Sequence, residues 1–125
     1  MVLRTTRRNA KIVIGSDIGV SGGTICAEQS IIIGNECLIG ANVTLVDNDF
    51  HAITANGRRF NNNESDISAA PVVISNNVFL GAQSIILKGV VVGENSIVGA
   101  GTILTSNVDA DVVVAGSPTK IIKKL

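Results

Sequence analysis

The chain's single histidine, His51, ends the segment Asp47-Asn48-Asp49-Phe50-His51. A neutral imidazole, with an unperturbed pKa of about 6.5, accepts a proton from a hydroxyl at neutral pH and so serves as a general base. Asp47 and Asp49 are candidates for the group that orients the ring, while the alternative for either is a turn or a loop cap. A lone loop histidine is also often a solvated surface residue, so the elements around His51 have to distinguish catalysis from exposure.

The two cysteines, Cys26 and Cys37, offer a second kind of chemistry. No apolar segment of signal-peptide type follows the charged N-terminus, and no apolar run reaches the roughly 18 residues that span a bilayer. We therefore expect a cytoplasmic protein in which both thiols are reduced and buried rather than bridged. Both also fall at positions of the repeat described below where small apolar side chains pack, which argues against a covalent intermediate on sulfur.

Charge and composition exclude several broad functions. The ten basic and ten acidic residues cancel, which argues against a general binder of nucleic acid or of anionic membranes. Apolar residues make up 46% of the chain but aromatic residues only 2%, so a folded core has to be built from small and branched side chains. Arg58, Arg59 and the run Asn61, Asn62, Asn63 are suited to a polar or phosphorylated ligand, yet they equally well form a solvated loop.

A period of six residues organises most of the chain. Neither a helix of period 3.6 nor a strand of period 2 explains it. It predicts short parallel strands joined by tight corners, with three hexads in each triangular coil, about four coils, and glycines that allow positive φ near the corners. The residue after each apolar anchor is usually small, and the residue four places on is small or β-branched. Eleven of the thirteen anchors are Ile, Leu or Val; the set is Ile14, Val20, Cys26, Ile33, Ile39, Leu45, Ile74, Leu80, Ile86, Val92, Val98, Leu104 and Ala110.

The repeat is interrupted between Leu45 and Ile74 by a polar, Asn-rich stretch that ends at Pro71. Long excursions from a compact scaffold commonly carry function, and His51 directly follows the last regular hexad before this one. We predict one all-β domain over residues 1–125, with repeat coils at about 12–50 and 72–115 and an excursion loop at about 51–71. The helical spacing of Ile121, Ile122 and Leu125 predicts a short C-terminal capping helix at about 116–125.

Three runs of the sequence, IIIGNECLIGANVTL, VVISNNVFLGAQSIILKGVVVGENSIVGAGTILT and VVVAGSPTKIIKKL, together resemble the hexapeptide-repeat acyltransferases. They are most similar to the sugar O-acetyltransferase branch, which includes maltose and galactoside acetyltransferases. The resemblance covers residues 12 to 125 and implies a left-handed parallel β-helix. It also implies transfer of an acetyl group from acetyl-CoA to a hydroxyl of a sugar or nucleotide sugar, in a homotrimer with sites between chains. His51 stands where these enzymes carry their catalytic histidine.

The same resemblance implies that a backbone N–H around Gly81-Ala82 stabilises the oxyanion of the reaction. Ala82 and Ala100 are eighteen residues apart, one full coil, so they stack on one face. By resemblance this face, with Phe79 and Thr105, lines the pantetheine arm of coenzyme A. The alternatives are trimer packing or an exposed corner for Phe79 and ordinary coil surface for Thr105.

Lys120 and Lys123 stand where the resembling enzymes carry basic residues for the phosphates of coenzyme A. The alternative for both lysines is the solvated face of the C-terminal cap. We expect no metal, because the γ-class carbonic anhydrases, which share the coil, need three histidines for each zinc and this chain has one. Acylation of an amine on an amino sugar or antibiotic, and a catalytically inactive scaffold, are the remaining alternatives.

Overall fold

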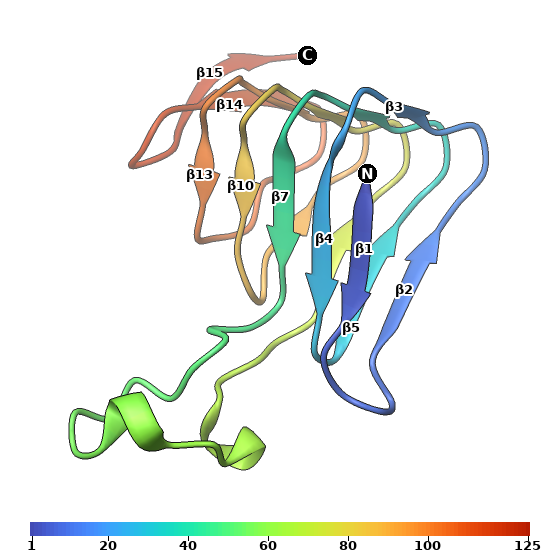
Figure 1. Ribbon diagram of the computed structural model, residues 1–125. Helices are drawn as coiled ribbons and strands as arrows, with labels where there is room; N and C mark the ends of the chain where they lie inside the picture. Colours follow the sequence, from blue (N-terminus) through green and yellow to red (C-terminus); the bar gives the residue numbers. More distant parts are fainter.

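The computed structural model describes all 125 residues and shows a β-solenoid whose successive strands turn through three sheets (Figure 1). The sheets hold five, four and six strands, in the orders β1-β4-β7-β10-β13, β11-β8-β5-β2 and β15-β14-β12-β9-β6-β3. Each coil contributes one strand to the five-stranded sheet, so the solenoid has at least five coils, whereas the repeat predicted about four. The strands are β1 (Val2–Thr5), β2 (Lys11–Ile14), β3 (Gly19–Val20), β4 (Gly23–Ala27), β5 (Ser30–Ile33), β6 (Leu38–Ile39), β7 (Val43–Val46), β8 (Val72–Ile74), β9 (Phe79–Leu80), β10 (Ile85–Ile86), β11 (Val91–Val92), β12 (Ile97–Val98), β13 (Ile103–Leu104), β14 (Val112–Ala115) and β15 (Lys120–Lys124).

The interior is filled by the two rows of side chains that the repeat predicted. Anchors from Ile33 to Leu104 are at most 2% exposed, and most residues four places on, such as Val43 and Ser84, are at most 1% exposed. Stacked strands pair in register, Leu45 with Ile86 and Ile86 with Leu104, so each anchor packs against the equivalent anchor of the next coil. No aromatic ring enters this core, since Phe50, Phe60 and Phe79 are all exposed. Branched aliphatic side chains therefore supply the apolar burial that holds the coils together.

Two predicted anchors are out of register. Cys26 pairs with Val46 on the outer row of the five-stranded sheet, and its neighbour Ile25 points inward beside Leu45. The corner before Ile25 is one residue shorter than a hexad allows and the corner after it is two residues longer, so the period slips there. Ala110 is exposed because the corner after β13 is shortened, which places Val108 beside Val92 instead.

The small residue after each anchor is needed mainly because the backbone of the next coil approaches it closely, and less often because it must adopt a positive φ. A Cβ on Gly81 would lie 2.5 Å from the backbone nitrogen of Ala100 in the next coil, so only glycine fits. Positive φ falls instead three residues after the anchors, mostly on polar residues such as Asn77, Gln83 and Asn95, with glycine at Gly101. The prediction that these glycines supply the corner φ is therefore wrong for most of them.

The C-terminal segment is a strand and not the predicted capping helix. Strand β15 pairs antiparallel with β14, with Val113 opposite Lys123 and Ala115 opposite Lys120. An open strand edge offers unpaired backbone groups, and pairing satisfies them where a helix would leave them exposed. The N-terminus also differs, since β1 pairs with β4 and already belongs to the solenoid, ahead of the predicted start near residue 12.

The excursion loop leaves after β7 and returns at β8, projecting away from the coils (Figure 1). It carries two short 3-10 turns, η1 (Arg58–Phe60) and η2 (Glu64–Asp66). Its base is closed by an antiparallel bridge between Asn48 and Ala69, so the loop is tied at the point where it departs. The structure contains no helix long and apolar enough to cross a membrane.

Candidate active site

The carboxylate of Asp47 holds the corner that follows β4. One oxygen accepts a hydrogen bond from the backbone N–H of Glu28 at 2.7 Å, and the other accepts from Gln29 and Ser30 at 2.8 Å each. Asp47 is fully buried, and both of its oxygens are therefore engaged in satisfying a turn. The suggestion that Asp47 orients His51 is not supported, because its place in the structure is that of a loop cap.

The turn that presents His51 is fixed by its own neighbours. The side-chain amide of Asn48 donates to Asp47 at 3.0 Å, and its oxygen accepts from the backbone N–H of Phe50 at 2.8 Å. Phe50 has a φ of 62°, a left-handed conformation uncommon for an aromatic residue, and the backbone N–H of His51 donates to the carbonyl of Asp49 at 2.7 Å. The turn therefore projects the imidazole outward, exposed and with no hydrogen bond within its own chain.

Lys88 joins the site from the adjacent coil. Its ammonium lies 2.6 Å from a carboxylate oxygen of Asp49, and both side chains are partly exposed. The pair links the start of the loop to the corner after β10, so Asp49 acts on the backbone that carries His51 and not on the ring. Sequence reasoning missed Lys88, although it is the only charged residue between Val72 and Gly93.

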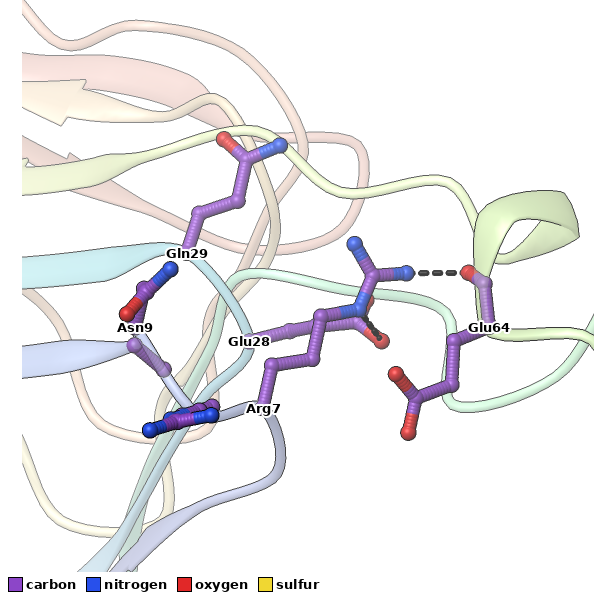
Figure 2. A pocket seen from close by; sticks show the side chains of 7 residues that line it. Arg7, Asn9, Glu28, Gln29 and Glu64 are labelled. Atoms are coloured by element: carbon purple, nitrogen blue, oxygen red, sulfur yellow. Dashed lines mark hydrogen bonds and ion pairs between the residues drawn. The ribbon is translucent and has the colours of Figure 1, made fainter.

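Glu28 is a second missed residue and, after Asp47, the most deeply buried charge near His51. It is 4% exposed; one carboxylate oxygen lies 2.8 Å from Nε of Arg7, and the other is buried with no hydrogen-bond partner. Figure 2 shows Arg7 between Glu28 and Glu64, where its guanidinium also donates to the Glu64 carbonyl of the loop. The pair therefore clamps the excursion loop to the first coil. The signal for Glu28 was a carboxylate in the otherwise uncharged stretch from Gly19 to Asn35.

His51 stands between two hollows. One, of about 560 Å³, is lined by His51 with Arg58 and Arg59 of the loop. The other, of about 270 Å³, lies between the loop and the first two coils. Eight residues line it: Arg4, Thr6, Glu28, Asn48, Phe50, His51, Glu64 and Ile67.

The oxyanion candidates separate in the structure. The backbone N–H of Gly81 donates to the carbonyl of Val98 at 2.7 Å and belongs to the coil ladder, so its assignment is wrong. The N–H of the exposed Ala82 has no backbone acceptor and remains free to donate. Ala82 also stacks below Ala100, since its carbonyl accepts from Gly101 at 2.9 Å, in agreement with their eighteen-residue spacing.

Three of the remaining residues predicted to contact coenzyme A, Phe79, Lys120 and Lys123, lie on the six-stranded sheet. Phe79, 41% exposed, lies on the outer face of the six-stranded sheet, one row from Ile97, which pairs with Val113, which in turn pairs with Lys123. Lys123 is thus three strand spacings from Phe79, roughly 14 Å. Lys120, opposite Ala115, lies on the same edge strand.

Thr105 lies at a different corner from Ala82 and Ala100 of its own chain. Ala82 and Ala100 occupy the corner that precedes the five-stranded sheet, while Thr105 follows β13 at the corner beyond it. His51 and Lys88 lie on that second side as well, after β7 and β10. One sheet therefore separates the candidate base from the candidate oxyanion donor of the same chain.

Both thiols are free and buried, as expected. Burial raises the pKa of Cys26, and the nearby carboxylates of Asp47 and Glu28 add to the effect while Arg4 opposes it. Burial likewise raises the pKa of Cys37, whose sulfur donates to the carbonyl of Ser75 at 3.1 Å. A protonated, enclosed thiol is a poor nucleophile, so packing is the role that the structure gives to both.

Comparison with known proteins agrees with this fold and with the resemblance read from the repeat. The family model for the hexapeptide repeat of succinyl-transferase matches residues 12–46 and 71–106, on both sides of the excursion loop. The chain belongs to the hexapeptide-repeat acetyltransferase family, and the predicted left-handed parallel β-helix is confirmed.

Individual relatives include both oxygen and nitrogen acetyltransferases. Galactoside O-acetyltransferase of Escherichia coli K12 is 34% identical over 105 residues, 82% of this chain and 48% of that protein. A 2,3,4,5-tetrahydropyridine-2,6-dicarboxylate N-acetyltransferase of Staphylococcus aureus is 53% identical over 57 residues, 46% of this chain and 24% of that protein. The chain therefore spans about half or less of the length of these relatives.

Solved structures match over nearly the whole chain. A hexapeptide-repeat acetyltransferase from Vibrio cholerae superposes with a TM-score of 0.82 at 24% identity, covering 98% of this chain and 70% of that one. A galactoside acetyltransferase in complex with coenzyme A superposes with a TM-score of 0.73 at 29% identity, covering 98% of this chain and 64% of that one.

Proposed function

We propose that this protein transfers an acetyl group from acetyl-CoA to a hydroxyl of a saccharide, with His51 as the general base. The observation that carries the proposal is the constrained turn from Asp47 to His51, which projects the chain's only histidine from the coil between two hollows. A solvated surface histidine would not need a buried carboxylate, a left-handed Phe50 and a lysine contact to set its backbone.

The reaction follows from the groups present. The imidazole removes the proton of the acceptor hydroxyl, and the oxygen attacks the thioester carbonyl carbon of acetyl-CoA. The negative charge that develops on the carbonyl oxygen is met by the free N–H of Ala82. Collapse breaks the carbon–sulfur bond, and the thiolate takes the proton held by the imidazolium, so His51 is returned to its neutral form.

A trimer brings the two halves of this site together. His51 and Ala82 lie on the two corners that flank the five-stranded sheet, which prevents one chain from placing both at one reacting carbon. If that sheet faces a threefold axis, the His51 corner of one chain meets the Ala82 corner of the next, three times over. The outward apolar row of this sheet, which includes Ile85 and Ile103, then packs at the axis.

The proposed binding of acetyl-CoA is supported by the row of residues from Phe79 to Lys123 on the outer face of the six-stranded sheet. This row lies beside the stacked Ala82 and Ala100. Small residues there leave the backbone accessible, as an extended pantetheine arm requires. The two edge lysines supply positive charge at the end where the phosphates of coenzyme A would lie. The relative solved with coenzyme A bound supports the same donor.

The decisive experiment compares the protein with its His51→Ala variant. We expect both to bind coenzyme A with equal affinity by calorimetry, while the variant's turnover with a saccharide acceptor falls at least about a hundredfold, because only the proton transfer is lost. Near-normal turnover in the variant would remove His51 as the base. Absence of coenzyme A binding by the folded protein would contradict the acyltransferase proposal itself.

An amine acceptor is the second candidate, favoured by the 53% identity to the N-acetyltransferase segment. That match covers 46% of the chain, whereas the match to the galactoside enzyme covers 82%, so we place the hydroxyl first. Paired acceptors that differ only in carrying a hydroxyl or an amine at one carbon separate the two. Preference for the amine by kcat/KM would reverse the order.

A further inference from the structure

The hollow between His51 and the excursion loop is lined by two arginines and no acidic residue. Arg58 and Arg59 belong to η1, and His51 stands at the start of the same loop. A site for a neutral sugar needs hydroxyl and amide partners, but it does not need two adjacent guanidinium groups beside the base. Their position therefore bears on which acceptor the site takes.

Both guanidinium groups keep donors available. Arg58 donates from one terminal nitrogen to the carbonyl of Ile53 at 2.8 Å, which fixes the side chain while the rest of its fork stays open. The Cζ of Arg59 lies 5.5 Å from the ring centre of Phe60, a contact with the ring face that leaves its N–H groups unengaged. Neither arginine takes part in an ion pair, because the two in the structure join Arg7 to Glu28 and Lys88 to Asp49.

The charges on the other side of His51 are compensated. Glu28 and Asp49 each have a basic partner, and the carboxylate of Glu64 lines the smaller hollow together with Arg4. Arg58 and Arg59 are therefore two cations without an ion-pair partner in a hollow that no carboxylate lines. Planar guanidinium forks bind carboxylate and phosphate groups in pairs of charge-assisted hydrogen bonds.

We infer that the acceptor of this enzyme is anionic: a saccharide whose carboxylate or phosphate binds Arg58 and Arg59 while its hydroxyl reaches His51. The inference rests on the proposed function and names the class of its acceptor. Coenzyme A is the other source of the same chemistry, since its phosphates are also anions, and the experiment has to separate the two.

The test measures kcat/KM for matched acceptors, a hexuronic acid against its methyl ester and a hexose phosphate against its hexose. The variants are Arg58→Gln/Arg59→Gln, Arg58→Lys/Arg59→Lys, and the control Arg8→Gln/Lys11→Gln, which removes equal charge from exposed positions that line no hollow with His51. We expect the wild type and control to prefer the anionic acceptors. The glutamine variant should lose at least about thirtyfold with these and less than about twofold with the neutral ones, and the lysine variant should fall between.

Four results would overturn the inference. Equal losses with anionic and neutral acceptors would mean that the arginines only shape the loop. Weaker coenzyme A binding by calorimetry in the glutamine variant, with the acceptor preference unchanged, would assign the arginines to the donor. Wild-type turnover that depends on His51 but favours neutral acceptors would refute the anionic acceptor and leave the proposed function standing, whereas no His51-dependent turnover with any acceptor would refute both.

Discussion

Two carboxylates in one short segment have separate tasks. Asp47 is fully buried and caps three backbone N–H groups of the corner after β4, whereas Asp49 is partly exposed and paired with Lys88. An unsatisfied buried amide costs far more than a lost exposed ion pair. Asp47 and Asp49 are two residues apart, a spacing common in turns, so the sequence does not separate their roles. Their hydrogen-bond and ion-pair partners in the structure distinguish the structural role of Asp47 from the positioning role of Asp49.

Replacing each Asp in turn tests this division. Asp47→Asn puts an NH2 group where an oxygen accepted hydrogen bonds, so we expect the free energy of unfolding to fall by about 3 kcal/mol in urea titration. Asp49→Asn is expected to leave stability within about 1 kcal/mol and to lower turnover on the order of tenfold, because the turn that aims His51 loosens. Equal stability losses in the two variants would contradict the assignment.

At the scale of the element, each corner of the solenoid combines two different demands. The residue after the anchor must let the next coil approach closely, and the residue two places further on adopts a left-handed φ. Gly81 meets the first demand and Gly101 the second. Glycine is required in one position and merely convenient in the other.

A pair of substitutions separates these demands. In Gly81→Ala the new Cβ would lie 2.5 Å from backbone of the next coil, which cannot move aside, so we expect the free energy of unfolding to fall by at least about 2 kcal/mol. Gly101→Asn places in open space the residue type found at the equivalent Asn77 and Asn95, and its effect should stay within about 1 kcal/mol. Thermal and urea unfolding provide the comparison. A costly Gly101→Asn with a harmless Gly81→Ala would overturn the assignment.

At the scale of the whole molecule, the proposed site residues lie on two corners, so the proposed activity requires the proposed trimer. The proposed trimer packs the five-stranded sheet toward the axis, and the four-stranded sheet then faces away. Each sheet carries an exposed apolar residue of similar accessibility, Ile103 at 36% and Val91 at 39%. They form a matched pair for testing which face is buried between chains.

Ile103→Glu should dissociate the trimer, since a buried unpaired carboxylate at a threefold axis is repeated three times. Turnover is expected to fall with the mass measured by analytical ultracentrifugation. Val91→Glu should leave both unchanged, because its side chain stays in solvent. A trimer disrupted by the Val91 variant but tolerant of the Ile103 variant would place the interface on the four-stranded sheet.

The sequence by itself determined the solenoid, the interior rows and the place of His51, because a period of six over many coils repeats one local constraint. Each inward residue meets its own kind above and below, so local pattern and tertiary packing carry the same information. The register slip at Cys26 escaped this reasoning, since one short corner and one long corner nearly cancel in the residue count. The C-terminal helix failed for a related reason: residues spaced for a helix also suit a strand, and the open edge of β14 selected the strand.

Only the tertiary structure decided which polar groups surround His51. Glu28, Arg7 and Lys88 come from other coils, at separations in sequence that follow from corner lengths and not from any motif. The same is true of Gly81, whose N–H is consumed by the ladder, and of Thr105, which a corner places beyond the five-stranded sheet. A repeat fixes where side chains point relative to the core. Which of them meet outside it depends on irregular corners and on one loop, where the period no longer applies.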